Sequence, residues 1–130
     1  AEPADLYRDP DLIVMPRRYG GLCMPAQDAV AAGIPVLMPA IPPNDSWLPP
    51  SWLIPADYTL TTDGRFPPVP VDVHQIDVDA LTHRVQAIVQ DDTRATNMAA
   101  DARRIGAGLT WDALLPTYRA FLNHVMGMAP

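Results

Sequence analysis

The first third of the chain contains two short apolar segments on either side of an alanine-rich stretch. Residues 12–16 (LIVMP) and 34–38 (IPVLM) are almost wholly apolar and too short for helices, so they predict strands buried on both faces. Residues 25–32 between them predict a helix, with Pro25 at its first position and Gly33 as its stop. This strand, helix, strand order is typical of a parallel sheet.

The pattern changes after Asp77, where apolar residues recur at helical spacing. Asp77 is placed to cap the first of these helices, whose apolar positions are Leu81, Val85, Ile88 and Val89. A second helix is expected over residues 93–105, stopped by Gly106 and Gly108.

A third helix is expected to start behind Thr110 as its cap. Its apolar side carries Leu114, Leu115, Tyr118, Phe121, Leu122 and Val125. Pro116 lies inside this helix and is expected to kink or restart it, because proline lacks the backbone N–H. Trp111 is expected to be a buried packing anchor rather than a ligand contact.

Prolines dominate the middle of the chain, where ten of the sixteen lie between Pro35 and Pro70. This composition predicts a long, rigid loop region, and the aromatic residues Trp47, Trp52 and Tyr58 favour burial or docking over a disordered linker. A third parallel strand is expected near residues 52–60. The predicted fold is therefore α/β, a single domain over residues 1–130 with a partial Rossmann-like parallel sheet and C-terminal helices.

Composition narrows the classes of partner and compartment. The formal net charge is −6 and all nine basic residues are arginines, so no basic stripe favours nucleic acid or an acidic membrane. Cys23 is the single cysteine, which excludes an internal disulfide and a cysteine zinc site and favours a reducing, cytoplasmic location. No apolar stretch reaches membrane-span length. His74, His83 and His124 lack metal-ligand spacing, so neither a metal nor a cofactor is expected.

The candidate binding site is the loop from Pro16 to Met24, which follows the first strand and opens the first helix. Ligands of open α/β sheets bind at this position, and Gly20 and Gly21 would allow the backbone to approach one closely. The candidate donors are the backbone amides of Leu22, Cys23 and Met24, which would be free at the helix start. Arg17 and Arg18 are candidate phosphate contacts or ordinary solvated charges, and an ordinary tight turn is the alternative for the loop.

The stretch DLYRDPDLIVMPRRYGGLCMPAQDAVAAGIPVLMP resembles the donor-binding half of GT-B glycosyltransferases, in particular the retaining family-4 type. The matching positions are Tyr7, Asp11, Pro16, Gly21, Met24, Pro25, Ala29, Ala31, Gly33, Pro35 and Val36. The segment GLTWDALLPTYRAFL is similar to the family's C-terminal helix, which crosses toward its partner domain. The resemblance covers most of the chain but is weak over residues 40–75.

This resemblance implies a parent enzyme that transfers a hexose from a nucleotide-diphosphate sugar to an unknown acceptor, without a metal-binding Asp-x-Asp motif. The family's glutamate that contacts the donor sugar falls at Gly20, which cannot replace it, and the one that binds the ribose falls at Asp28, which keeps a carboxylate. The family's acceptor-binding N-terminal domain and first strand-helix units are missing before Ala1, so we expect a processed or excised piece that is inactive alone. The alternative is a catalytically silent donor domain that serves as a binding or assembly module, with residues 40–58 as its contact surface.

Overall fold

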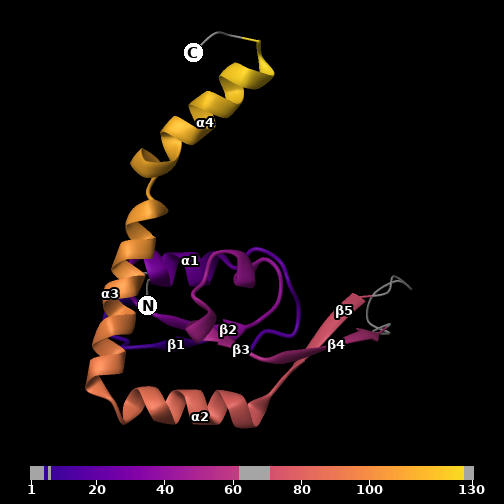
Figure 1. The fold of residues 1–130 in the computed structure, drawn as a ribbon, viewed down its shortest axis with the longest axis vertical. Helices are drawn as coiled ribbons and strands as arrows, with labels where there is room; N and C mark the ends of the chain where they lie inside the picture. The colour runs from indigo at the N-terminus through magenta and orange to yellow at the C-terminus, as the bar shows by residue number, and fades with distance from the viewer. Residues whose placement is uncertain (1–4, 6, 62–70, 128–130) are drawn as a thin grey trace.

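A computed structural model describes residues 5, 7–61 and 71–127 of the chain. Its regular elements, shown in Figure 1, are β1 (Ile13–Val14), α1 (Met24–Ala31), β2 (Val36–Pro39), β3 (Leu53–Ile54), β4 (Ala56–Thr61), β5 (Val71–Ile76), α2 (Val78–Val89), α3 (Asp92–Gly108) and α4 (Trp111–Val125). Two short 3₁₀ helices, η2 (Asn44–Ser46) and η3 (Pro50–Trp52), lie between β2 and β3.

A small parallel sheet forms the centre of the fold and confirms the α/β prediction. Its strand order is β1-β2-β3, with Ile13 opposite Val36 and Met38 opposite Leu53. All four residues of β2 are buried, as expected for a central strand whose residues are apolar on both faces. The predicted strands were longer than those observed, because only the residues that pair across this narrow sheet count as strand.

Helix α1 follows β1 and ends as the sequence predicted. Gly33 has a φ of +82°, a left-handed conformation that favours glycine. Its amide donates to the carbonyl of Val30 at 3.0 Å, and the amide of Ile34 donates to the carbonyl of Ala29 at 2.9 Å. These two bonds satisfy carbonyls at the helix end and direct the chain into β2.

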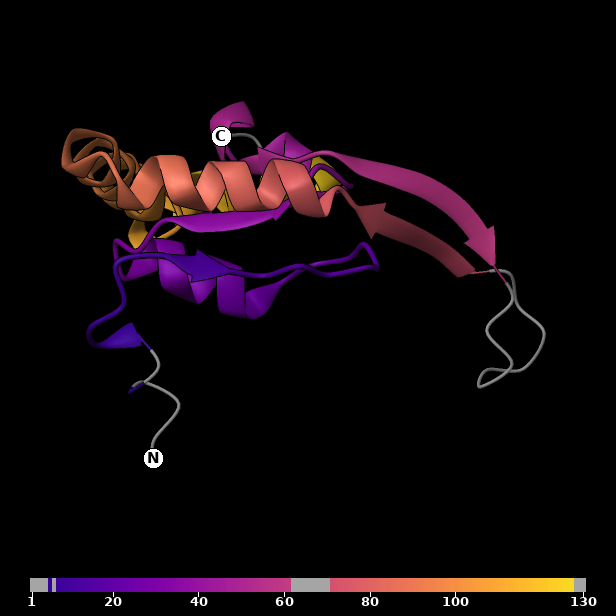
Figure 2. The ribbon, with the colours of Figure 1, turned by 90° about the horizontal axis from the view of Figure 1, so that it is seen from below.

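The prediction that residues 52–60 form one parallel strand is wrong beyond Ile54. Residues 56–61 form β4, which pairs antiparallel with β5, and this hairpin extends from the body on the side away from α3 (Figures 1 and 2). Strand β5 was not predicted, because the prolines that precede it suggested a loop. Residues 62–70, which include the last three prolines of that region, lie outside the described residues.

The predicted burial of a tryptophan in the middle region is confirmed for Trp52, which is fully buried. The same segment places Ile41, Leu48 and Ile54 among the buried residues. Residues 40–58 therefore cannot offer these side chains as an external contact surface, and the hypothesis that placed one there is wrong for them. Ile54 belongs to β3, and Leu48 and Trp52 join the same hydrophobic core, where burial removes their apolar area from water.

Helices α2 and α3 begin at aspartate caps. The side chain of Asp77 accepts from the amide of Ala80 at 2.8 Å, as predicted, and that of Asp91 accepts from the amide of Arg94 at 3.1 Å. Gly106 does not stop α3, which continues to Gly108. A Cβ atom at Gly106 would lie 2.5 Å from the carbonyl oxygen of Val30, so this glycine permits close packing of α3 against α1.

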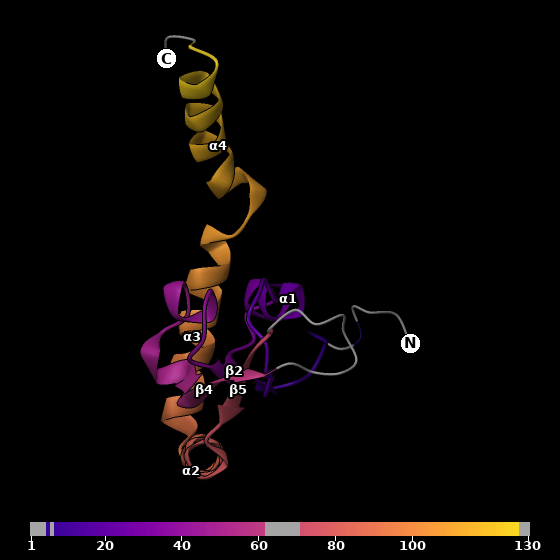
Figure 3. The same cartoon turned by 90° about the vertical axis from the view of Figure 1, so that its right-hand side faces the viewer.

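Helix α4 continues beyond α3 and rises away from the rest of the molecule (Figures 1 and 3). The hydroxyl of Thr110 caps it by accepting from the amide of Ala113 at 3.3 Å, as predicted. It runs through Pro116 as one helix, so the proline does not restart it, and none of its residues is buried. Trp111 is 64% exposed, and the prediction that it is a buried anchor is wrong.

Candidate functional site

The loop between β1 and α1 lies at the carboxyl end of β1, where the sequence placed the candidate site. The amide of Met15 donates to the carbonyl of Leu37 at 2.9 Å, which extends the pairing with β2 up to the loop. Gly21 then adopts a φ of +104°, a conformation that other residues rarely take. The chain turns there and enters α1 at Met24, three residues later.

The start of α1 leaves backbone donors available. Cys23 is the N-cap residue, but its side chain makes no capping bond and the first turn contains no acidic residue. Its carbonyl accepts from the amides of Ala26 and Gln27 at 3.1 and 3.2 Å. Within the described residues the amides of Leu22, Cys23 and Met24 have no acceptor among the hydrogen bonds of the loops and caps. The partial positive charge of this helix end is therefore uncompensated.

A hollow of about 320 Å³ opens beside these donors. Its walls are Met15, Arg17, Leu22, Cys23 and Pro25. The guanidinium of Arg17 donates to the carbonyl of Gly21 at 3.4 Å, which holds this cation near the helix start. Cys23 is only 7% exposed and its thiol lies 3.7 Å from the sulfur of Met15, so it forms part of an apolar wall. A cation and helix-start amides around a hollow suit an anionic group.

Arg18 is placed differently from Arg17. It is exposed and does not line the hollow, so only one of the two predicted arginines lies at the site. Its carbonyl accepts from the amide of His74 at 2.7 Å, a bond that joins the loop to β5. The hairpin thus helps to fix the loop that carries the site.

Gly20 packs against the segment that follows β2. A Cβ atom at Gly20 would lie 2.7 Å from the carbonyl oxygen of Pro42. This segment is anchored, because Ile41 is buried and the buried Asn44 side chain donates to the carbonyl of Pro39 at 3.1 Å. A side chain of any size at position 20 would have to displace it.

Asp28 lies on the exposed side of α1, one turn beyond Met24. It does not line the hollow beside Cys23. The structure therefore places it on the same helix as the free amides but outside their immediate surroundings, and a ligand would have to extend along the helix to reach both.

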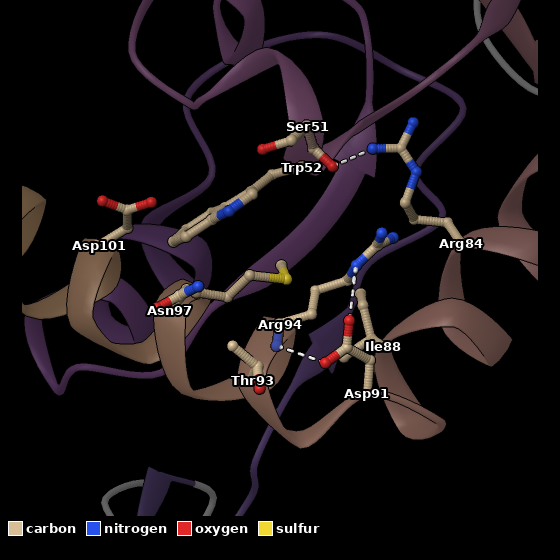
Figure 4. A pocket seen from close by; sticks show the side chains of 10 residues that line it. Ser51, Trp52, Arg84, Ile88, Asp91, Thr93, Arg94, Asn97 and Asp101 are labelled. Carbon is tan, nitrogen blue, oxygen red and sulfur yellow. Dashed lines mark hydrogen bonds and ion pairs between the residues drawn. The ribbon is translucent and has the colours of Figure 1, made fainter.

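A larger cleft, which the sequence analysis did not predict, lies between η3, α2 and α3 (Figure 4). It measures about 430 Å³ and has Trp52, Ile88 and Met98 among its apolar walls. No sequence motif indicates this cleft, because its walls come from three segments that are far apart in the chain. The indole N–H of Trp52 is buried and has no hydrogen-bond partner within the described residues.

The charged groups of this cleft are partnered within the protein. The guanidinium of Arg84 donates to the carbonyl of Ser51, and this bond connects α2 to η3 (Figure 4). The guanidinium of Arg94 lies 3.9 Å from one carboxylate oxygen of Asp91, and the other oxygen of Asp91 caps α3. Asp101 pairs with Arg104 at 3.0 Å. The first of these interactions joins two helices and the second lies at a helix cap, whereas the pair of Asp101 and Arg104 lies within α3.

The described part of the chain contains no group of three or more histidine, cysteine or acidic residues that could hold a metal ion. None of its helices has the length and apolarity needed to cross a bilayer. Comparisons of the chain with protein-family models, with curated proteins and with solved structures find no match.

Proposed function

We propose that this chain is the nucleotide-sugar-binding portion of a glycosyltransferase, and that the diphosphate of the donor lies against the start of α1. The observation that carries this proposal is a hollow lined by the tethered Arg17, Leu22 and Cys23, at a helix start whose first amides have no acceptor among the loop and cap hydrogen bonds. The resemblance to GT-B donor domains adds the substrate class, a nucleotide-diphosphate hexose. The parent enzyme would transfer this hexose to an acceptor.

The chemistry at this site would be electrostatic. The amides of Leu22, Cys23 and Met24 would donate to phosphate oxygens, and the charge of Arg17 would stabilise the diphosphate as it departs from the sugar. Asp28 would accept hydrogen bonds from the ribose hydroxyls of a nucleotide that extends along the exposed side of α1. Arg18, which is exposed near the loop, would add only a screened charge.

A catalytically silent donor domain is the second candidate function. The packing of Gly20 against Pro42 favours it, because no side chain at position 20 can reach a donor sugar. Such a module would retain the diphosphate cradle without selecting a hexose.

The test is a ligand-observed NMR titration with inorganic pyrophosphate, UDP, GDP, ADP, TDP and their hexose conjugates. Under the main proposal one nucleotide sugar binds, and Arg17→Gln weakens it about tenfold or more, because a hydrogen bond to a charged group contributes about 1.5–3 kcal/mol. Asp28→Ala should weaken the nucleotide but not pyrophosphate. Arg119→Gln, an exposed arginine on α4, is the matched control and should change nothing.

The titration results distinguish the two candidate functions from each other, and both from the case in which no ligand binds at the start of α1. Equal affinity for a nucleotide and its hexose conjugate would favour the silent domain. Binding that is indifferent to Arg17→Gln, or no binding of any phosphate compound, would contradict the siting at α1.

A further inference from the structure

A row of exposed apolar side chains that has no partner within the described residues lies on α4. Tyr118 and Leu122 are 50% and 52% exposed, and Phe121 and Val125 are 62% and 64% exposed. Trp111 and Tyr118 belong to the same face, because their rings stack with centroids 5.6 Å apart. Isolated exposed apolar residues are ordinary, whereas a continuous row of this kind marks an interaction surface.

The spacing of this row is that of a helix-pairing seam. The seam is defined by Trp111, Leu114, Leu115, Tyr118, Phe121, Leu122 and Val125. Trp111, Tyr118 and Val125 are seven residues apart, and a pair of apolar residues fills each interval. A repeat of seven residues keeps one side of a helix against another helix along its whole length.

Helix α4 also needs a partner for its stability. Isolated helices of about 12–15 residues are only marginally stable in water, and Pro116 removes one backbone donor from this helix. None of its fifteen residues is buried, and only Leu114, Leu115 and Asn123 are half-buried, so tertiary packing supplies little of the missing stabilisation.

We propose that the seam pairs with the seam of a second copy of this chain in an antiparallel helix dimer. The seam is symmetric about Tyr118, so antiparallel pairing sets Trp111 against Val125 and Leu115 against Phe121 of the second copy. Leu114 likewise meets Leu122, and the two Tyr118 residues meet each other at the centre. Each seam residue therefore meets another seam residue.

The charge of α4 and its position clear of the body favour a second copy of the chain as the partner of the seam. Antiparallel pairing places Asp112 near His124 of the other copy, and it sets the helix dipoles in opposite directions. Helix α4 carries one aspartate and one arginine, so it is close to neutral although the whole chain has a net charge of −6. It rises clear of the body in two perpendicular views, which leaves room for a second helix (Figures 1 and 3).

Analytical ultracentrifugation over a concentration series tests the proposal. The sedimenting mass should rise to twice that of the chain, and Phe121→Asp should keep it monomeric at every concentration. The matched control is Ala120→Asp, which puts the same charge on the same helix but at an exposed position outside the seam. This control should still dimerise.

Cysteine substitution tests the direction of the pairing. Tyr118→Cys should form an interchain disulfide on mild oxidation, whereas Trp111→Cys should not, because position 111 faces position 125 of the other copy. The wild-type chain is the control for Cys23, which is buried. A wild-type chain that stays monomeric throughout the series, a dimer that survives Phe121→Asp, or equal cross-linking at both positions would overturn the proposal.

Discussion

Helices α1 and α4 differ in which apolar side chains they bury: α1 buries small ones, whereas α4 leaves large ones exposed. Helix α1 has eight residues and buries Ala26, Ala29 and Val30 completely, although two of these are alanines. Helix α4 has fifteen residues and a row of large apolar side chains, yet it buries none. Burial in this chain therefore follows the presence of a packing partner and not the size of the apolar side chains.

The difference depends on how closely backbones approach one another. Gly106 of α3 lies so near the carbonyl of Val30 that α1 and α3 are in backbone contact, and small residues make this possible. The large side chains of α4 have no such neighbour within the described residues. They suit a partner helix, which is the reason for the proposed dimer.

Removal of a buried tryptophan should have the largest effect. Trp52→Ala should lower the free energy of unfolding by about 3–5 kcal/mol, because it empties a large volume inside the core that includes α1 and the sheet. Chemical denaturation followed by circular dichroism would measure the loss. A loss below about 1 kcal/mol would mean that this part of the chain is not packed as described.

Alanine substitution of two glycines of α3 should change the free energy of unfolding in opposite directions. Gly106→Ala should destabilise the chain by about 1–3 kcal/mol, because its methyl group would overlap the backbone of α1. Gly108→Ala meets nothing within 4 Å, and it should stabilise the chain by up to about 1 kcal/mol through helix propensity. Denaturation of both variants in parallel measures the difference. Equal effects would show that α1 and α3 are not in close contact.

Removal of an exposed tryptophan should have the smallest effect. Trp111→Ala, made together with Phe121→Asp so that α4 stays unpaired, should change the free energy of unfolding by less than about 1 kcal/mol. The comparison is with Phe121→Asp alone in the same denaturation experiment. A loss comparable to that of Trp52→Ala would mean that α4 folds back onto the body.

Some features of the candidate site depend on residues close in sequence, and others depend on contacts with distant residues. The glycine turn and the free amides at the start of α1 follow from residues close in sequence, and the sequence predicted their positions. The difference between Arg17 and Arg18 did not follow from it, because only the tertiary structure shows which of them lines the hollow. The reason for glycine at position 20 lies in Pro42, more than twenty residues away.

The sequence by itself determined the elements whose causes are local. Apolar segments of strand length predicted β1 and β2, Gly33 predicted the end of α1, and the Asp77 and Thr110 side chains predicted two helix starts. Periodicity, a left-handed glycine and a capping oxygen each act within a few residues, so they can be read from the chain.

Only the tertiary structure decided which segments meet. It paired β4 with β5 instead of adding residues 56–60 to the parallel sheet, and it used Gly106 for contact with α1 instead of as a helix stop. It buried Trp52 and left Trp111 exposed, although both are large aromatic side chains of the same type. The physical reason is that burial and strand pairing are properties of two surfaces, and a local pattern describes only one of them.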